Sequence, residues 1–176
     1  MATLELITNT VVGSGGASSV TFSSIPDTYQ HLMIVASGRS ARSAYNDGSN
    51  MRFNGETSGN NQSAVTLVQN GNAAAGTSET NDNRVSYLFD CPGADALADQ
   101  FGANIVYLPN YRWGEFKNVI GWNSNSHTTF DTNDYANDVC VGSWRSTAAV
   151  TSILIQNGVG NFDEHSTFTL YGINSA

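Results

Sequence analysis

The chain has 176 residues and a formal net charge of −8, from 15 acidic and 7 basic residues. That length predicts a single domain with one core. Apolar residues make up 40% of the chain, which excludes an intrinsically disordered protein, and no run approaches the roughly 18 apolar residues of a membrane helix. Lys117 is the single lysine and the arginines are scattered, which excludes the basic surface of a nucleic-acid-binding protein.

The first five residues, 1–5, include a carboxylate and no basic segment. They do not resemble a secretory signal, so we expect synthesis in a cytoplasm without export by that route.

Apolar and polar residues alternate along much of the chain, and turn-forming residues separate the alternating runs. This pattern predicts β-strands. In chain order we expect strands at 2–12, 18–24, 29–38, 50–54, 64–69, 84–89, 101–108, 116–122, 139–144, 151–157 and 165–173. The Gly-, Ser- and Asn-rich segment 70–83 is predicted to be an exposed loop, because it lacks apolar anchors. Residues 92–100 are predicted to form one short helical turn.

About eleven short strands and almost no helix predict an all-β protein. Two packed antiparallel sheets can bury the apolar sides of so many strands, so we expect a jelly-roll-like antiparallel β-sandwich. Residues 1–176 are expected to form it as one domain. Because only 12% of the residues are charged, the polar surface must consist mostly of Ser, Asn, Thr and Gly.

The residue patterns of common catalytic sites are missing from the chain. His31, His127 and His165 are isolated from one another, without the spacing of zinc ligands. Neither a G-x-S-x-G nucleophile motif nor a phosphate-binding loop occurs. Paired carboxylates for glycoside cleavage, such as Asp163 and Glu164, stay open because such pairs meet only in three dimensions. We expect no enzymatic activity, no cofactor and no metal.

An acidic run offers the alternative of a calcium site, because hard cations bind clustered oxygen ligands. The run consists of Asp131, Asn133, Asp134 and Asp138. Ala136 stands where an EF-hand loop has glycine, and no glutamate closes the loop. A solvated acidic loop is the favoured interpretation, and 131–134 is also a second candidate region for paired carboxylates.

The two cysteines, Cys91 and Cys140, are too few and too far apart for a disulfide framework. We interpret them as buried free thiols, because an unpaired cysteine behaves as a small apolar residue.

Several stretches, taken in order, resemble a widespread group of small virion proteins encoded by tailed phages. They are 20–29 (VTFSSIPDTY), 31–43 (HLMIVASGRSARS), 52–57 (RFNGET), 142–149 (GSWRSTAA) with Ile153, and 161–162 (NF) with 166–173 (STFTLYGI). Each motif is short and apolar, so their order along most of the chain carries the resemblance.

The resemblance implies a non-enzymatic structural component of the tailed-phage virion with jelly-roll-like architecture. The matched residues are implied to determine the fold. Pro26 would lie at a turn, Trp144 and Phe168 in the core, and Gly172 where the final strand is closely approached. No catalytic residue is carried over from the family.

We favour a capsid decoration (cement) protein that bridges capsid subunits from outside the head, because the sequence contains no coiled coil or stalk that would join a fibre. We expect a homotrimer, since a phage lattice offers threefold positions, with the major capsid protein as a further partner and neither nucleic acid nor membrane. The alternative is a tail or fibre-tip domain that binds a carbohydrate receptor. Candidate contact or sugar-stacking residues are Tyr107, Tyr111, Trp113 and Trp122, although aromatic residues on strands usually belong to a core or a subunit contact.

Overall fold

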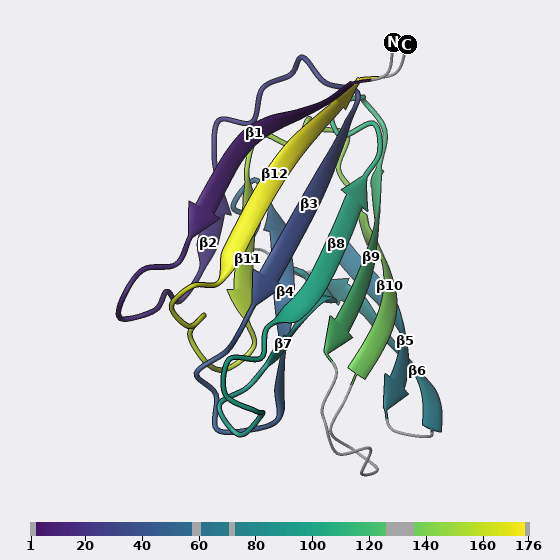
Figure 1. Ribbon diagram of the computed structural model, residues 1–176. Helices are drawn as coiled ribbons and strands as arrows, with labels where there is room; N and C mark the ends of the chain where they lie inside the picture. Colours follow the sequence, from purple (N-terminus) through teal and green to yellow (C-terminus); the bar gives the residue numbers. More distant parts are fainter. Residues whose placement is uncertain (1–2, 58–60, 71–72, 126–135, 175–176) are drawn as a thin grey trace.

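The computed structural model describes residues 3–57, 61–70, 73–125 and 136–174. Every regular element in these ranges is a β-strand (Figure 1). The strands are β1 (Thr3–Val11), β2 (Val20–Phe22), β3 (His31–Gly38), β4 (Asn46–Phe53), β5 (Gln62–Asn70), β6 (Ala73–Asp82), β7 (Val85–Pro92), β8 (Gly102–Leu108), β9 (Lys117–Asn125), β10 (Ala136–Trp144), β11 (Ile153–Asn157) and β12 (Thr167–Asn174).

The strands form two antiparallel sheets, which confirms the predicted β-sandwich. The eight-stranded sheet has the order β1-β12-β3-β8-β9-β10-β5-β6, and the four-stranded sheet has the order β2-β11-β4-β7. Most connections carry the chain from one sheet to the other, as in a jelly roll. Because β1 pairs with β12, the two ends of the described chain lie side by side (Figure 1).

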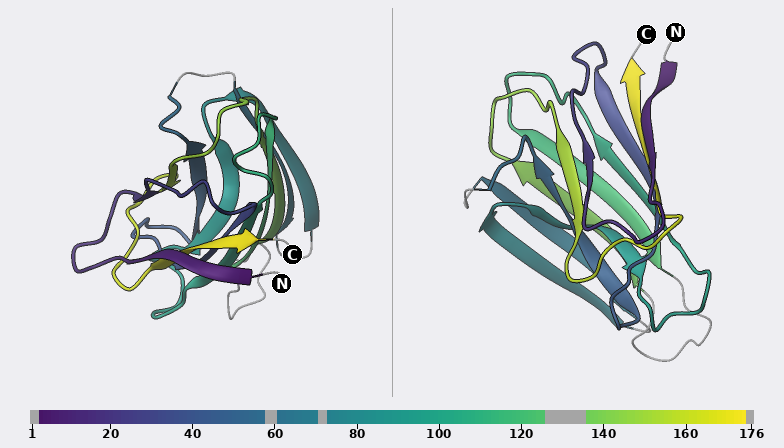
Figure 2. Two further views of the ribbon diagram at one scale, coloured as in Figure 1. Left: turned by 90° about the horizontal axis from the view of Figure 1, so that it is seen from above. Right: turned by 90° about the vertical axis from the view of Figure 1, so that its left-hand side faces the viewer.

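One hydrophobic core fills the space between the two layers, which Figure 2 shows from above and from the side. Trp144 stacks on Phe53 with ring centroids 5.3 Å apart. Phe168 packs edge-on against Phe162 at 4.7 Å. Trp144 and Phe168 are therefore core residues, as the resemblance implied.

Tight contacts also surround Gly172 and Pro26. A Cβ atom on Gly172 would lie 2.3 Å from the ring of Tyr29, so any side chain would displace that ring. Pro26 lies in the bent segment between β2 and β3, and its carbonyl oxygen accepts a hydrogen bond from the hydroxyl of Tyr111. The roles implied for both residues agree with these contacts.

All eleven predicted strands are present, with ends that differ by a few residues. The loop predicted at 70–83 is wrong, because Ala73–Asp82 forms β6 and pairs with β5. Residues 74–78 of this edge strand are exposed on both faces, so they carry no apolar alternation that could have predicted a strand. Main-chain hydrogen bonds to β5 hold β6 in the sheet.

The helical turn predicted at 92–100 is also wrong. The segment makes two hydrogen-bonded turns, in which Ala96 N–H donates to the Gly93 oxygen at 3.1 Å and Gln100 N–H to the Leu97 oxygen at 3.3 Å. Asp99 has a φ of +62°, a left-handed conformation that a helix does not continue through. The described residues contain no helix, and so none long and apolar enough to cross a membrane.

Candidate interaction surface

The outer face of the eight-stranded sheet, which points away from the four-stranded sheet, carries a line of exposed apolar side chains. In register from strand to strand they are Val35 (β3), Ile105 (β8), Trp122 (β9), Val139 (β10) and Leu67 (β5). Their exposed fractions lie between 37% and 63%. A sandwich strand usually presents polar side chains to solvent, so this line is an exception.

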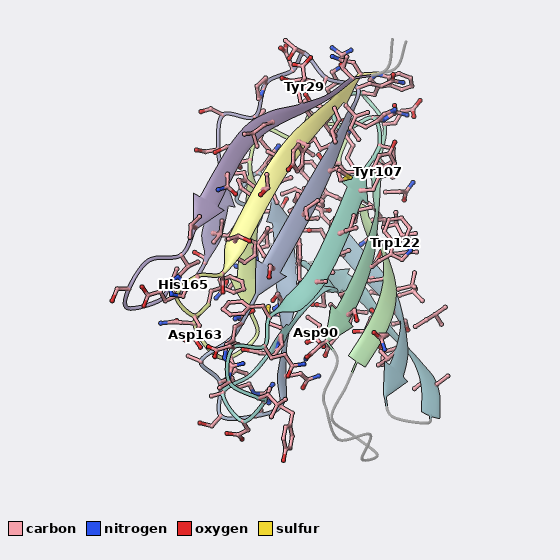
Figure 3. The ribbon with its side chains drawn as sticks, viewed as in Figure 1. Tyr29, Asp90, Tyr107, Trp122, Asp163 and His165 are labelled. Atoms are coloured by element: carbon pink, nitrogen blue, oxygen red, sulfur yellow. The ribbon has the colours of Figure 1, made fainter. Side chains whose placement is uncertain are left out.

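A second line of side chains lies beside the first and is offset from it by two residues on each shared strand. Its members are Tyr171 (β12), Met33 (β3), Tyr107 (β8), Ile120 (β9), Val141 (β10) and Val65 (β5). The two lines together are termed the apolar belt. Figure 3 labels Tyr107 and Trp122, which come from the neighbouring strands β8 and β9.

The outer face is uncharged as well as apolar. Among the described residues, no Asp, Glu, Lys or Arg belongs to the outer side of β12, β3, β8, β9, β10 or β5. The charged residues of β9 and β10, Lys117 and Asp138, are buried on the inner side. Small neutral groups flank the belt, such as the hydroxyls of Ser63 and Ser143, 2.7 Å apart. The net charge of −8 therefore lies elsewhere on the molecule.

His31, at one end of this face, is neutral too. Burial lowers its pKa, and its Nδ1 accepts a hydrogen bond from the N–H of Asn110 at 3.1 Å, which requires an unprotonated nitrogen. The His31 ring lies 5.6 Å from the ring of Tyr107, and burial raises the pKa of the Tyr107 hydroxyl. Neither group contributes charge to this face near pH 7.

The structure brings together only two of the four predicted aromatic residues. Tyr107 and Trp122 are diagonal neighbours in the belt. Trp113 is 44% exposed but lies in the loop between β8 and β9. The contact role predicted for Tyr111 is wrong, because Tyr111 is only 1% exposed and belongs to the core.

Two shallow hollows open on this face. One, of about 270 Å³, has a lining of six residues, which are Tyr107, Pro109, Asn118, Val119, Ile120 and Val141. The other, of about 460 Å³, lies over β10, β5 and β6 and includes Val139 and Leu67 in its lining. Both linings are mainly apolar, so the face suits an apolar side chain or a ring rather than an ion.

The carboxylates proposed for glycoside cleavage have other positions. Asp163 pairs with Arg39, with Oδ2 and Nε 3.6 Å apart, and its N–H donates to the Arg39 oxygen at 2.8 Å. Asp163 thus holds the segment before β12 against Arg39, and Glu164 is exposed beside it. His127, Asp131, Asn133 and Asp134 lie outside the described residues.

The solvated loop predicted from the acidic run is wrong for Asp138. It lies within β10, on the inner side of the sheet, and is buried. Sequence reasoning missed this because the strand begins at Ala136, before the apolar alternation of 139–144 starts.

Both cysteines are buried free thiols, as predicted. Cys140 donates to the Ser86 oxygen at 3.2 Å, and burial raises its pKa to about 11. Burial also raises the pKa of the Cys91 thiol. Neither is a reactive thiolate near neutral pH.

The belt offers hydrophobic contact and ring stacking rather than acid–base chemistry. In the part of the chain that the structure describes, no three His, Cys, Asp or Glu side chains come together as metal ligands. No model of a known protein family matches the chain, and no curated protein does.

Proposed function

We propose that the protein is a non-enzymatic structural protein of a tailed-phage virion, and that it decorates the capsid from outside. The observation that carries the proposal is the uncharged apolar belt on the outer sheet face. The ordered set of motifs that resembles phage virion proteins supports the same assignment. The belt is the surface by which the protein attaches to the capsid.

The extent of the face suits such an attachment. Six neighbouring strands of seven to nine residues, with spacings of about 4.8 Å between strands and 3.3 Å between residues, give an area on the order of 700 Å². A standard protein interface buries about 800 Å² on each partner. Exposed apolar patches of several hundred Å² usually mark an interaction site.

The lack of charge narrows the chemistry of the partner surface. A basic or acidic partner would be matched by opposite charges, which this face lacks. We therefore expect a neutral capsid surface with apolar and small polar side chains.

A homotrimer belongs to the same proposal, because threefold positions of a capsid lattice suit a closed cyclic assembly. Size-exclusion chromatography with light scattering is expected to show an assembly of three chains in solution. If assembly needs the capsid, a reconstruction of the phage head is expected to show three copies around a threefold axis. Single isolated copies on the capsid would contradict it.

The alternative function is receptor binding at a tail or fibre tip, and one observation favours it. Tyr107 and Trp122 lie on one exposed face beside an apolar hollow, an arrangement on which sugar rings can stack.

The two functions differ in where the protein acts. Phage particles with and without the protein are heated, and genome release is measured. We expect release at a lower temperature without the protein, and antibody labelling on the head. Unchanged head stability together with antibody labelling on the tail would favour receptor binding instead.

Re-attachment of purified variants tests the belt itself. Trp122→Arg is expected to bind at least about tenfold more weakly, because a central aromatic contact is replaced by an unpaired charge. Leu97→Arg is the matched control, since Leu97 is equally exposed but lies in the loop between β7 and β8. Equal binding by both variants would exclude the belt as the attachment surface.

A further inference from the structure

A row of polar side chains lies on the inner face of the eight-stranded sheet. Asn104 of β8 pairs with Asn123 of β9, and Asn123 pairs with Asp138 of β10. All three residues are buried. The inner face of a sandwich is normally apolar, so the row needs a physical explanation.

A second buried carboxylate faces this row from the four-stranded sheet. Asp90 of β7 is 3% exposed, and its N–H donates to Oδ1 of Asn104 at 2.8 Å. Figure 3 labels Asp90 toward the lower end of the sandwich. Burial raises the pKa of Asp90 to about 7 and that of Asp138 to about 6, and the charge of Asp138 adds to the shift at Asp90. The two carboxylates are thus buried near each other.

Two oxygen atoms of this group have no hydrogen-bond partner. They are Oδ1 of Asp138, which is 6% exposed, and Oδ1 of Asn123, which is 5% exposed. The amide nitrogen of Asn123 donates to the Tyr87 oxygen at 3.2 Å, which fixes the orientation of its amide group. Both unpartnered atoms are therefore acceptors, and buried acceptors without a partner destabilise a fold.

A cavity of about 160 Å³ adjoins the two carboxylates. Its lining includes Asp90, Asp138, Asn46 and Arg42. Since a water molecule occupies about 30 Å³, the cavity has room for an ion with several waters.

Arg42, a cation in the cavity lining, pairs with a different carboxylate. Arg42 Nη1 lies 3.7 Å from Oδ1 of Asp47 and 3.3 Å from the carbonyl oxygen of Asn46. In the described part of the chain, neither Asp90 nor Asp138 takes part in an ion pair. Two buried carboxylates thus share a cavity whose lining cation, Arg42, pairs with Asp47 rather than with them.

We propose that this cavity binds a hard divalent cation, Ca²⁺ in preference to Mg²⁺, between the carboxylates of Asp90 and Asp138. Waters in the cavity complete the coordination. An all-oxygen set suits a hard cation, and ligands from two different sheets suit the flexible geometry of Ca²⁺ better than the strict octahedron of Mg²⁺. The ion supplies the counterion that the two carboxylates lack and a partner for the unpaired Oδ1 of Asp138.

The test compares chelator-treated protein in Ca²⁺ and in Mg²⁺, with ionic strength held constant by NaCl. Calorimetric titration up to about 10 mM, above the range of weak extracellular calcium sites, is expected to show one Ca²⁺ per chain. The unfolding temperature is expected to rise with Ca²⁺ concentration and to rise less with Mg²⁺.

Matched variants locate the site. Asp90→Asn and Asp138→Asn keep the side-chain shape, and each is expected to bind Ca²⁺ at least about tenfold more weakly, because one of two charged ligands is lost. Asp163→Asn, a control at a surface carboxylate, is expected to bind like the wild type. Circular dichroism checks that each variant folds. Absence of calcium binding by the wild type, or equal binding by Asp138→Asn and the wild type, would overturn the proposal and leave the cavity to water alone.

Discussion

The two faces of strands β8, β9 and β10 carry opposite exceptions to the usual burial of side chains. On the outer face apolar residues are exposed, and one position away on the inner face polar residues are buried. The adjacent pairs, outer residue first, are Ile105 and Asn104, Trp122 and Asn123, and Val139 and Asp138. In each pair, the period of two places neighbours on opposite sides of the sheet.

Both faces are incomplete in the isolated chain, but for different reasons. The outer face exposes apolar area, whose removal from water is favourable by about 25 cal/mol per Å² before the costs of association are subtracted. In the inner row, Oδ1 of Asp138 and Oδ1 of Asn123 lack a donor, and Nδ2 of Asn104 lacks an acceptor. No ion pair among the described residues gives Asp90 or Asp138 a counterion. We therefore propose a macromolecular partner for the outer face and an ion for the inner row.

The largest expected effect is the difference in free energy of unfolding between a variant in the core and a variant on the outer face. Leu88→Ala in β7 is expected to lower the free energy of unfolding by about 2 to 5 kcal/mol, because Leu88 is fully buried. Leu67→Ala in the belt removes the same atoms from an exposed site, and its effect is expected to stay within about 0.5 kcal/mol. Urea unfolding of both variants measures the difference. A large effect at Leu67 that grows with protein concentration would show that the belt is already covered by another copy in solution.

The second effect is a dependence of stability on pH that originates in the inner row. The folded-state pKa values of Asp90 and Asp138, about 7 and about 6, lie above the ordinary carboxyl value of 3.8. The folded state therefore binds more protons, and its stability from this source is complete below about pH 4 and is lost as the pH rises to about 7. Without divalent ions, unfolding at pH 5 is expected to cost on the order of 3 kcal/mol more than at pH 8.

Variants and ions sharpen this second effect. Asp90→Asn is expected to remove most of the pH dependence, whereas Asp163→Asn leaves it unchanged. Saturating Ca²⁺ is expected to reduce the difference, because an ion stabilises the ionised carboxylates at the higher pH. If Asp90→Asn kept the full dependence, Asp90 would not be its source.

The smallest expected effect concerns salt. Attachment through the belt is expected to change less than about threefold between about 0.05 and 0.5 M NaCl, because an uncharged contact has no long-range charge interactions to screen. Binding of labelled protein to stripped particles measures it. A steep loss of binding with salt would place the attachment on a charged part of the surface instead.

The local alternation of apolar and polar residues was sufficient to predict most of the secondary structure. Alternation identified eleven strands because the two-residue period is a property of the extended backbone itself. It missed β6, whose residues 74–78 are exposed on both sides and are held only by pairing with β5. The buried state of Cys91 and Cys140 also followed from composition alone.

The sequence by itself determined that the chain is an all-β sandwich with few charges, because strand period and composition are local properties. Only the tertiary structure decided which side of each strand faces the second sheet, since alternation is the same for both sides. It exposed Trp122 and buried Tyr111, although both are aromatic residues in the same region of the chain. It also brought Asp90 and Asp138 together from different sheets, because their proximity depends on how the two layers pack, which no local pattern encodes.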